Sequence, residues 1–272
     1  MNIFNLAAAG GVVGGIGLLL GALLGYASQF FSVEVNEQER KVREALPGNN
    51  CGGCGFSGCD ALAEAIVKGE ASVSACPVGG ESVAKAIADI MGVNADHHEK
   101  KTAFVACQGT CDKVNIQYDY YGLEDCQSAG VVPGAGGKAC RYGCMGYGSC
   151  VKVCEFGAIH VENGVAVVDT DRCVACGKCV AVCPNHLISL IPANAPYVIP
   201  CSSQEKGKAV KESCMAGCIG CSLCTRQCEF GAVSMDGNVA RMDYDKCQGC
   251  GKCALKCPVK VIRVHAAAGI SE

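Results

Sequence analysis

The hydropathy pattern sets the start of the chain apart, because residues 1–33 contain no charged side chain and residues 3–31 are mostly apolar or small. Such a run is long enough to cross a bilayer, and without a basic start it does not resemble a cleavable signal peptide. Small residues recur every three or four positions and would line one face for close helix approach: Gly10, Gly14, Gly17, Gly21 and Gly25. The pattern predicts a transmembrane helix over residues 1–32, either docked against membrane subunits or acting as a plain lipid anchor.

Basic residues first appear after this run, at Arg40, Lys41 and Arg43. By the positive-inside rule, the part of the chain that follows the helix lies in the cytoplasm. We therefore expect a single-pass protein of the cytoplasmic (inner) membrane, with its C-terminal domains on the cytoplasmic side.

The remaining hydropathy pattern predicts short helices and hairpins. Helical periodicity starts at Cys59 and can end at Gly69, and a second amphipathic helix spans residues 81–91 before Gly92. Alternating apolar residues flank Asn163-Gly164 and Asp236-Gly237, which is typical of tight-turn β-hairpins. Residues 102–106 read as a short buried strand. The fold class is thus α+β.

Composition narrows the chemistry. The 272 residues include 25 cysteines and no tryptophan, and the net charge is −3. Without a secretory context, so many thiols indicate metal centres in a reducing compartment. The chain has no basic stripe, which argues against nucleic-acid binding. It also lacks a dinucleotide fingerprint, so flavin and nicotinamide chemistry would reside on other subunits.

The cysteines of residues 140–257 form an internal duplication with a shift of 74 residues. The second copy contains two runs with the spacing Cys-x2-Cys-x2-Cys-x3-Cys, which is that of bacterial ferredoxins, where the fourth cysteine of each run binds the cluster of the other run. Each copy therefore predicts a two-cluster ferredoxin module. The second copy predicts one cluster on Cys218, Cys221, Cys224 and Cys257, and another on Cys228, Cys247, Cys250 and Cys253.

The first copy departs from this spacing at one position, because Tyr147 stands where the second copy has Cys221. Cys140 is the obvious substitute ligand, and its equivalent in the second copy, Cys214, is then spare. The first copy predicts one cluster on Cys140, Cys144, Cys150 and Cys183, and another on Cys154, Cys173, Cys176 and Cys179.

A further cysteine group follows the first 50 residues, with the spacing Cys-x2-Cys-x4-Cys-x16-Cys: Cys51, Cys54, Cys59 and Cys76. Four thiolates can hold zinc, but next to ferredoxin modules we expect a 4Fe–4S cluster. Zinc explains the Pro-terminated ferredoxin runs poorly, and disulfides suit a short secreted chain rather than this one.

Five cysteines are left over: Cys107, Cys111, Cys126, Cys201 and Cys214. Three or four of them could hold a further cluster, while free buried cysteines are the commoner case, and we prefer that interpretation. The sequence thus predicts five 4Fe–4S clusters and leaves a sixth open. The expected domains are a transmembrane helix (1–32), a small helical 4Fe–4S domain (33–95), a connecting segment (96–139) and two tandem ferredoxin modules (140–192 and 193–272).

The order of these features resembles a known family. An uncharged glycine-rich segment precedes Leu46-Pro-Gly-Asn-Asn-Cys-Gly-Gly-Cys-Gly-Phe-Ser-Gly-Cys59, then Cys76-Pro77 and the ferredoxin runs. This is similar to the B subunit of the Rnf complexes, the ion-translocating ferredoxin:NAD oxidoreductases of bacterial membranes. The resemblance implies an electron-transfer subunit without a complete active site of its own. It would accept electrons from reduced ferredoxin and pass them to membrane and flavin-bearing subunits, in a complex that exports sodium ions or protons.

Three alternatives remain. One is the same role in the related complex that reduces an oxidant-sensing transcription factor, and another is a polyferredoxin subunit of a different redox enzyme. The third, from another class, is a zinc-binding membrane scaffold. From chain order alone, we expect electrons to arrive at the second module, cross the first and leave through the Cys51–Cys76 domain.

Overall fold

The computed structural model describes residues 3–30, 36–94 and 99–265 of the chain. Helix α1 covers Ile3–Phe30, at the place of the predicted membrane helix. The prediction of a transmembrane helix is nevertheless wrong, and with it that of a single-pass membrane protein, because no helix within the described residues is both long and apolar enough to span a bilayer. The glycines along α1 add no apolar side chain, which lowers the apolar surface of each turn. Residues 1–2 and 31–32 of the predicted segment lie outside the described ranges.

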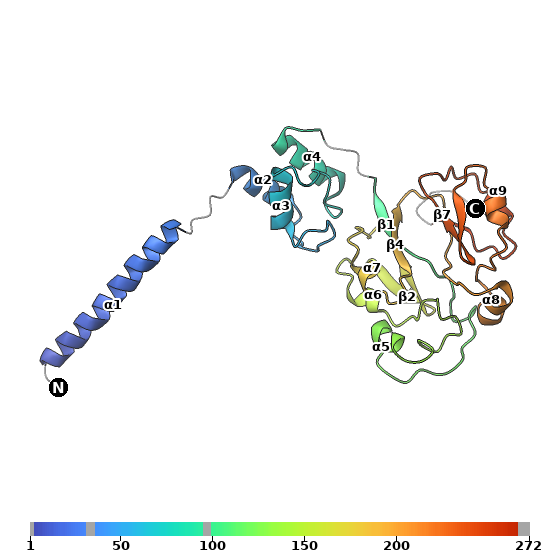
Figure 1. Ribbon diagram of the computed structural model, residues 1–272, viewed down its shortest axis with the longest axis horizontal. Helices are drawn as coiled ribbons and strands as arrows, with labels where there is room; N and C mark the ends of the chain where they lie inside the picture. Colours follow the sequence, from blue (N-terminus) through green and yellow to red (C-terminus); the bar gives the residue numbers. More distant parts are fainter. Residues whose placement is uncertain (1–2, 31–35, 95–98, 266–272) are drawn as a thin grey trace.

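Three helices form a small domain after α1 (Figure 1). They are α2 (Glu37–Ala45), α3 (Cys59–Val67) and α4 (Gly80–Met91). Helix α4 ends at Gly92, whose left-handed φ of 67° is the usual glycine stop. The domain core joins all three helices through Val42, Leu62, Ile66 and Ile87, each at most 2% exposed. The helices predicted after Cys59 and from residue 81 are therefore confirmed.

The rest of the described chain contains two similar modules, each with a hairpin and a second strand pair. The hairpins pair β2 (Ile159–Glu162) with β3 (Val165–Val168), and β6 (Val233–Asp236) with β7 (Val239–Met242). Both are antiparallel, and Ile159 pairs with Val168 as Val233, 74 residues later, pairs with Met242. The predicted hairpins and their duplication are thus present.

The second strand pair of each module joins distant segments. Strand β1 (Lys101–Val105) pairs antiparallel with β4 (Ile188–Pro192), and β5 (Tyr197–Val198) pairs with β8 (Arg263–Val264). Residues of β1 lie in the core of the first module, because Ala103 and Val105 pack among its buried side chains. The predicted connecting segment therefore supplies part of the first module. Of that segment, residues 96–98 are outside the described ranges.

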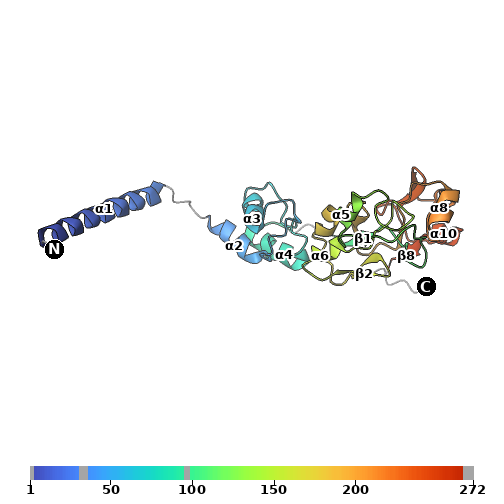
Figure 2. The ribbon, with the colours of Figure 1, turned by 90° about the horizontal axis from the view of Figure 1, so that it is seen from below.

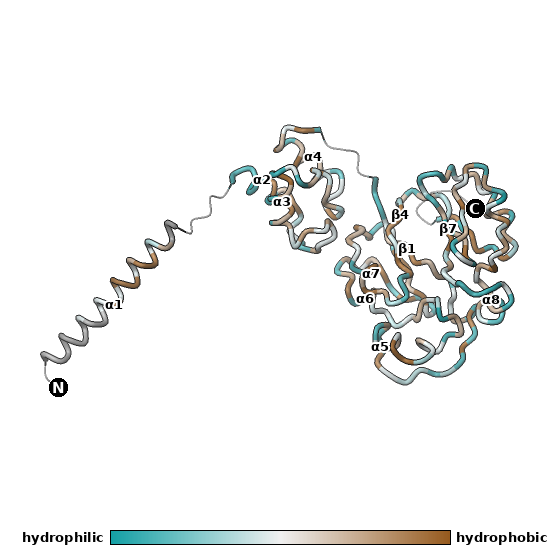
Figure 3. Tube along the Cα trace, in the orientation of Figure 1, coloured by the Kyte–Doolittle hydropathy of each residue, from teal (hydrophilic) through white to brown (hydrophobic). Residues whose placement is uncertain are grey.

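Short helices connect the strands and carry several of the cysteines. They are α5 (Cys126–Gly130), α6 (Ser149–Lys152), α7 (Lys178–Val182), α8 (Gly207–Ser213), α9 (Leu223–Gln227) and α10 (Lys252–Leu255). Figure 2 shows the domains following one another in sequence order, from the three-helix domain through the first module to the second. In the hydropathy view, α2 is largely hydrophilic, while apolar residues are concentrated on α3 and on the strands of the modules (Figure 3).

Candidate iron–sulfur centres

Two cavities are lined by the cysteine sets that the sequence assigns to the later run of each module. One is lined by Cys154, Cys173, Cys176 and Cys179. The equivalent cavity of the second module is lined by Cys228, Cys247, Cys250 and Cys253. In both, three cysteines come from one loop and the fourth from the earlier run, as the ferredoxin spacing requires.

The loop that carries three cysteines turns tightly, and residues with positive φ angles make this tight turn possible. Ala175 and Gly177 have φ angles of 54° and 80°, and their equivalents Gly249 and Gly251 both have 70°. Left-handed residues of this kind bend the chain back on itself, so that the three thiols face one cavity. The same backbone conformation thus recurs 74 residues later, together with the same cysteine spacing.

Backbone amides donate hydrogen bonds to the remote cysteines in both modules. Ala158 N lies 3.4 Å from Cys154 Sγ, and Ala232 N lies 3.2 Å from Cys228 Sγ. The same contact recurs at Cys183 and Cys257, each 3.4 Å from the amide nitrogen four residues later. Amide donors stabilise a thiolate and tune the potential of a cluster bound to it, so these cysteines suit iron–sulfur ligation.

The other cavity of the first module contains an unexpected cysteine. It is lined by Cys126, Cys144, Cys150 and Cys183. The structure thus brings Cys126 to the place for which the sequence suggested Cys140, and Cys140 lies in a different cavity.

Helix α5 holds Cys126 in this position. Asp125 caps the helix by accepting from Ser128 N at 3.0 Å, and it also accepts from the Ser149 hydroxyl. Cys126 N in turn donates to Ser149 Oγ at 2.8 Å. Because Ser149 begins α6, which carries Cys150, this network fixes α5 against the cysteine run.

Two features of the sequence pointed to Cys126. Cys107 and Cys140 are 33 positions apart, whereas their counterparts Cys201 and Cys214 are 13 apart. The first copy therefore contains an insertion with an extra cysteine, Cys126. The same copy lacks the ligand that Cys221 provides in the second copy.

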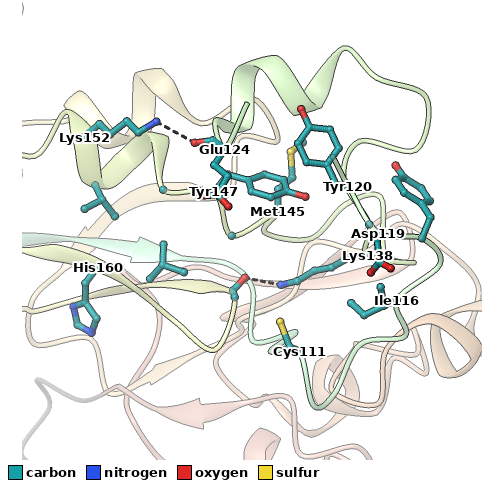
Figure 4. Close-up of a pocket in the computed structure, with 17 residues that line it drawn as sticks. Cys111, Ile116, Asp119, Tyr120, Glu124, Lys138, Met145, Tyr147, Lys152 and His160 are labelled. Carbon is teal, nitrogen blue, oxygen red and sulfur yellow. Dashed lines mark hydrogen bonds between the residues drawn. The ribbon is translucent and has the colours of Figure 1, made fainter. Parts of the chain in front are cut away.

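Tyr147, which replaces that in-line ligand, lies in an open pocket beside the module (Figure 4). Its ring packs against Tyr120 with a centroid separation of 5.1 Å. Lys138 crosses the floor of this pocket and donates to Gly164 O at 2.6 Å. The side chain of Tyr147 is thus part of an aromatic surface.

In the second module, the earlier run keeps its in-line cysteine. Cys218, Cys224 and Cys257 pack in one core cluster. Burial raises the pKa of Cys224, and charge on Cys218 and Cys221 would raise it further. Three of the four predicted ligands therefore pack together, Cys221 is near enough to affect Cys224, and Cys214 lines a cavity with Cys107, Cys140 and Cys201.

The cysteines of the three-helix domain lie around the start of α3. Cys59 and Cys76 are 8% and 9% exposed. Burial raises the pKa of Cys76, with charge on Cys59 and Cys54 as further causes. Asn50, in a left-handed conformation with φ of 47°, accepts from Cys59 N at 2.8 Å and so fixes the loop that carries Cys51 and Cys54.

This loop packs on the first ferredoxin module. A Cβ atom added to Gly53 would lie only 2.8 Å from Cys176 O. Negative charge on Cys51 also contributes to a raised pKa of Cys176, although burial is the main cause. The Cys51–Cys76 set and the Cys154–Cys179 set are therefore neighbours.

Burial raises the pKa of several thiols that line these cavities. Burial raises the pKa of Cys150 to about 12 and the pKa values of Cys179 and Cys253 to about 11. In each case the neighbouring cysteines of the same cavity raise the pKa further. Binding iron replaces the proton, so cluster assembly would release protons and is coupled to folding.

Four cysteines around one cavity are the ligand set that a 4Fe–4S cluster takes. Within the part of the chain that the structure describes, no three Cys, His, Asp or Glu side chains come together as a site for one metal ion. Tetrahedral zinc would draw its thiolates to about 3.8 Å from one another. A cubane, with an iron at alternate corners, holds four thiolates further apart around a central volume. When bound, such a cluster accepts and donates single electrons.

Comparisons with known proteins agree with this chemistry. A family model for an Fe–S cluster domain matches residues 46–78, one described as a 4Fe-4S binding domain matches residues 166–189, and one described as a 4Fe-4S dicluster domain matches residues 217–261. The fold and these matches define an iron–sulfur electron-transfer protein.

Similar proteins span nearly the whole chain. The chain is 46% identical over 253 residues to the B subunit of the Na(+)-translocating ferredoxin:NAD(+) oxidoreductase complex of Acetobacterium woodii, and the match covers 93% of this chain and 76% of that protein. It is 42% identical over 255 residues to the B subunit of the ion-translocating oxidoreductase complex of Methanosarcina acetivorans, covering 93% and 96%. It is 40% identical over 252 residues to the proton-translocating counterpart of Clostridium ljungdahlii, covering 91% and 88%.

The chain therefore belongs to the family of B subunits of ion-translocating ferredoxin:NAD oxidoreductase (Rnf) complexes, as its motifs predicted. It is an iron–sulfur electron-transfer subunit of an oxidoreductase complex.

Proposed function

We propose that this subunit accepts electrons from reduced ferredoxin and passes them to flavin-bearing subunits of the complex, which reduce NAD and couple the transfer to ion export. The names of the relatives from Acetobacterium woodii and Clostridium ljungdahlii, which specify sodium ions and protons respectively, support such coupling. The residues of this chain would bind the clusters, order them and keep water from them.

We infer five 4Fe–4S clusters from the cysteine sets described above. The proposed ligands of the three-helix domain are Cys51, Cys54, Cys59 and Cys76. Those of the first module are Cys126, Cys144, Cys150 and Cys183, and then Cys154, Cys173, Cys176 and Cys179. Those of the second module are Cys218, Cys221, Cys224 and Cys257, and then Cys228, Cys247, Cys250 and Cys253.

The observation that carries the proposed direction is the contrast between two equivalent loops. The loop at Cys176 is covered by Gly53 of the three-helix domain, while its equivalent, Cys250, is exposed. A partner ferredoxin can therefore approach the second module at Cys250. Electrons would leave through the Cys51–Cys76 set, which lies against the opposite end of the series.

The test is Cys54→Ala in the assembled complex. We expect the variant to lose about four iron atoms per chain and to lose electron transfer from reduced ferredoxin to NAD. Reduction of the remaining clusters by ferredoxin should persist, because they lie upstream of the lost site. Cys111→Ala, at an exposed cysteine outside all five sets, is the control. Unchanged NAD reduction in the Cys54 variant would overturn the proposed route.

A further inference from the structure

A further cysteine-lined cavity lies between the two ferredoxin modules. It is similar in size to the cavity around Cys154 and Cys173. Four of the residues that line it are cysteines, two from each copy of the duplication: Cys107, Cys140, Cys201 and Cys214. None of these four belongs to the five sets above.

The four cysteines are related by the internal repeat. Cys107 follows β1 and Cys201 follows β5, while Cys140 and Cys214 are equivalent residues separated by 74 positions. The backbone contacts repeat as well, because Cys107 Sγ accepts from Cys144 N at 3.3 Å and Cys201 Sγ accepts from Cys218 N at 3.2 Å. The two copies therefore contribute equivalent positions to one shared cavity.

Thiols of both copies lie close to Gly109 at this cavity. A Cβ atom added to Gly109 would lie 3.5 Å from Cys214 Sγ and 3.6 Å from Cys107 Sγ. Burial raises the pKa of Cys140 to about 11, and negative charge on the three other cysteines of the cavity would raise it further. Cys201 and Cys214 are 7% and 8% exposed.

A buried cation accompanies the four thiols. Lys138 is 9% exposed and is the only charged residue among the described residues that line the cavity. Its ammonium group donates to Gly109 O at 2.9 Å and to Gly164 O at 2.6 Å. A buried positive charge is costly unless it is compensated, and a cluster with four thiolate ligands is an anion that would compensate it.

The two copies are tied together around this site. Gln108 Nε2 donates to Ala216 O at 2.9 Å, and Ser202 Oγ donates to Ala106 O at 3.2 Å. Each bond crosses from one copy to the other beside a cysteine of the cavity. The site is therefore held by both modules and depends on their association.

We propose that Cys107, Cys140, Cys201 and Cys214 bind a sixth 4Fe–4S cluster at the junction of the two modules. The donor set, the size of the cavity and the amide donors are similar to those of the ferredoxin cavities. This inference rests on the proposed relay and adds its middle step.

The position of the junction site between the two modules suits a step of electron transfer between them. Cys144, whose amide binds Cys107 Sγ, belongs to the first set of the first module, and Cys218, whose amide binds Cys201 Sγ, belongs to the first set of the second. The junction site is thus in direct contact with one set on each side. Electrons that pass from the second module to the first would cross it.

The first test is iron and acid-labile sulfide content of the anaerobically purified full chain, for which six clusters predict about 24 iron atoms and five predict about 20. The second test uses Cys140→Ala and Cys214→Ala, singly and together. Each single variant should lose about four iron atoms, and the double variant should lose no more than either one, because both remove the same cluster.

The control is Cys111→Ala, which should keep the full iron content. Electron paramagnetic resonance of the reduced variants should show that the signals of the other clusters persist, which separates loss of one site from unfolding. A content of about 20 iron atoms in the unaltered chain would overturn the proposal. So would unchanged iron in both single variants, loss of zinc in place of iron, or an additive loss of about eight iron atoms in the double variant. None of these results would remove the five-cluster relay, which Cys54→Ala tests separately.

Discussion

The two ferredoxin modules have the same loops but obtain one ligand in different ways. Gly146 and Gly220 are equivalent and have φ angles of 87° and 67°. In both modules, a Cβ atom added to this glycine would clash with a carbonyl oxygen of the facing hairpin turn. In the second module that oxygen is Asn238 O, and it would lie 2.8 Å away. The backbone beside the next residue is therefore alike. In the second module this next residue is Cys221, and in the first it is Tyr147.

The insertion of the first module compensates for this difference. It forms α5, which brings Cys126 to the cavity that Tyr147 does not reach. The geometry of a cluster site can thus be preserved while the ligand moves to another segment. Local spacing identifies a site of this type only where the chain has not exchanged one ligand for another.

The largest expected effect comes from removing Cys126 and Cys140 together, the two cysteines that could replace the ligand missing at Tyr147. Cys126→Ala and Cys140→Ala should each lose about four iron atoms per chain, and the double variant should lose about eight, because the two residues line different cavities. Iron and sulfide analysis of anaerobic protein measures this. A double variant that loses only about four iron atoms would mean that Cys126 and Cys140 serve one cluster.

A rescue experiment tests whether the two modules are interchangeable at this position. Tyr147→Cys in the Cys126→Ala background restores the spacing of the second module and should regain about four iron atoms. Tyr147→Ser in the same background is the control and should regain none. Conversely, Cys221→Tyr should lose about four iron atoms, since the shorter interval in the second module contains no counterpart of Cys126. If Tyr147→Cys fails to restore iron, the equivalence of the two loops is wrong.

Much of the fold could be predicted because its causes are local. The hairpins follow from alternating apolar residues around turn residues such as Asn163 and Gly164, with φ angles of 44° and 75°. The three-cysteine loops follow from their spacing, and the structure gathers the sets at Cys173–Cys179 and Cys247–Cys253 as expected. The ligand assignments themselves stay predictions until iron is counted.

The differences arise where distant segments meet. The sequence assigned Cys140 from its nearness to Cys144, but α5 and the Asp125–Ser149 contacts bring in Cys126 instead. The junction cavity depends on contacts between the copies that no spacing encodes. The membrane helix was predicted from the length of an uncharged run, and it is not supported by the apolar content of the described helices.

The smallest expected effect concerns the contact between Gly53 and the Cys176 loop of the first module. Gly53→Ala would place a Cβ atom 2.8 Å from Cys176 O and 3.0 Å from Cys176 Cα, so the three-helix domain must shift away from the cluster loop. Because Gly53 ligates nothing, the iron content should stay unchanged while electron transfer from the first module to the Cys51–Cys76 domain slows. Stopped-flow oxidation of the reduced complex by NAD measures this step, with the exposed Ser57→Ala as the matched control in the same loop. Reduction by ferredoxin should not change, because the equivalent loop at Cys250 has no such cover. An unaltered rate of oxidation in Gly53→Ala would mean that electrons leave the first module by another surface, and that the covered and exposed loops do not mark the two ends of the relay.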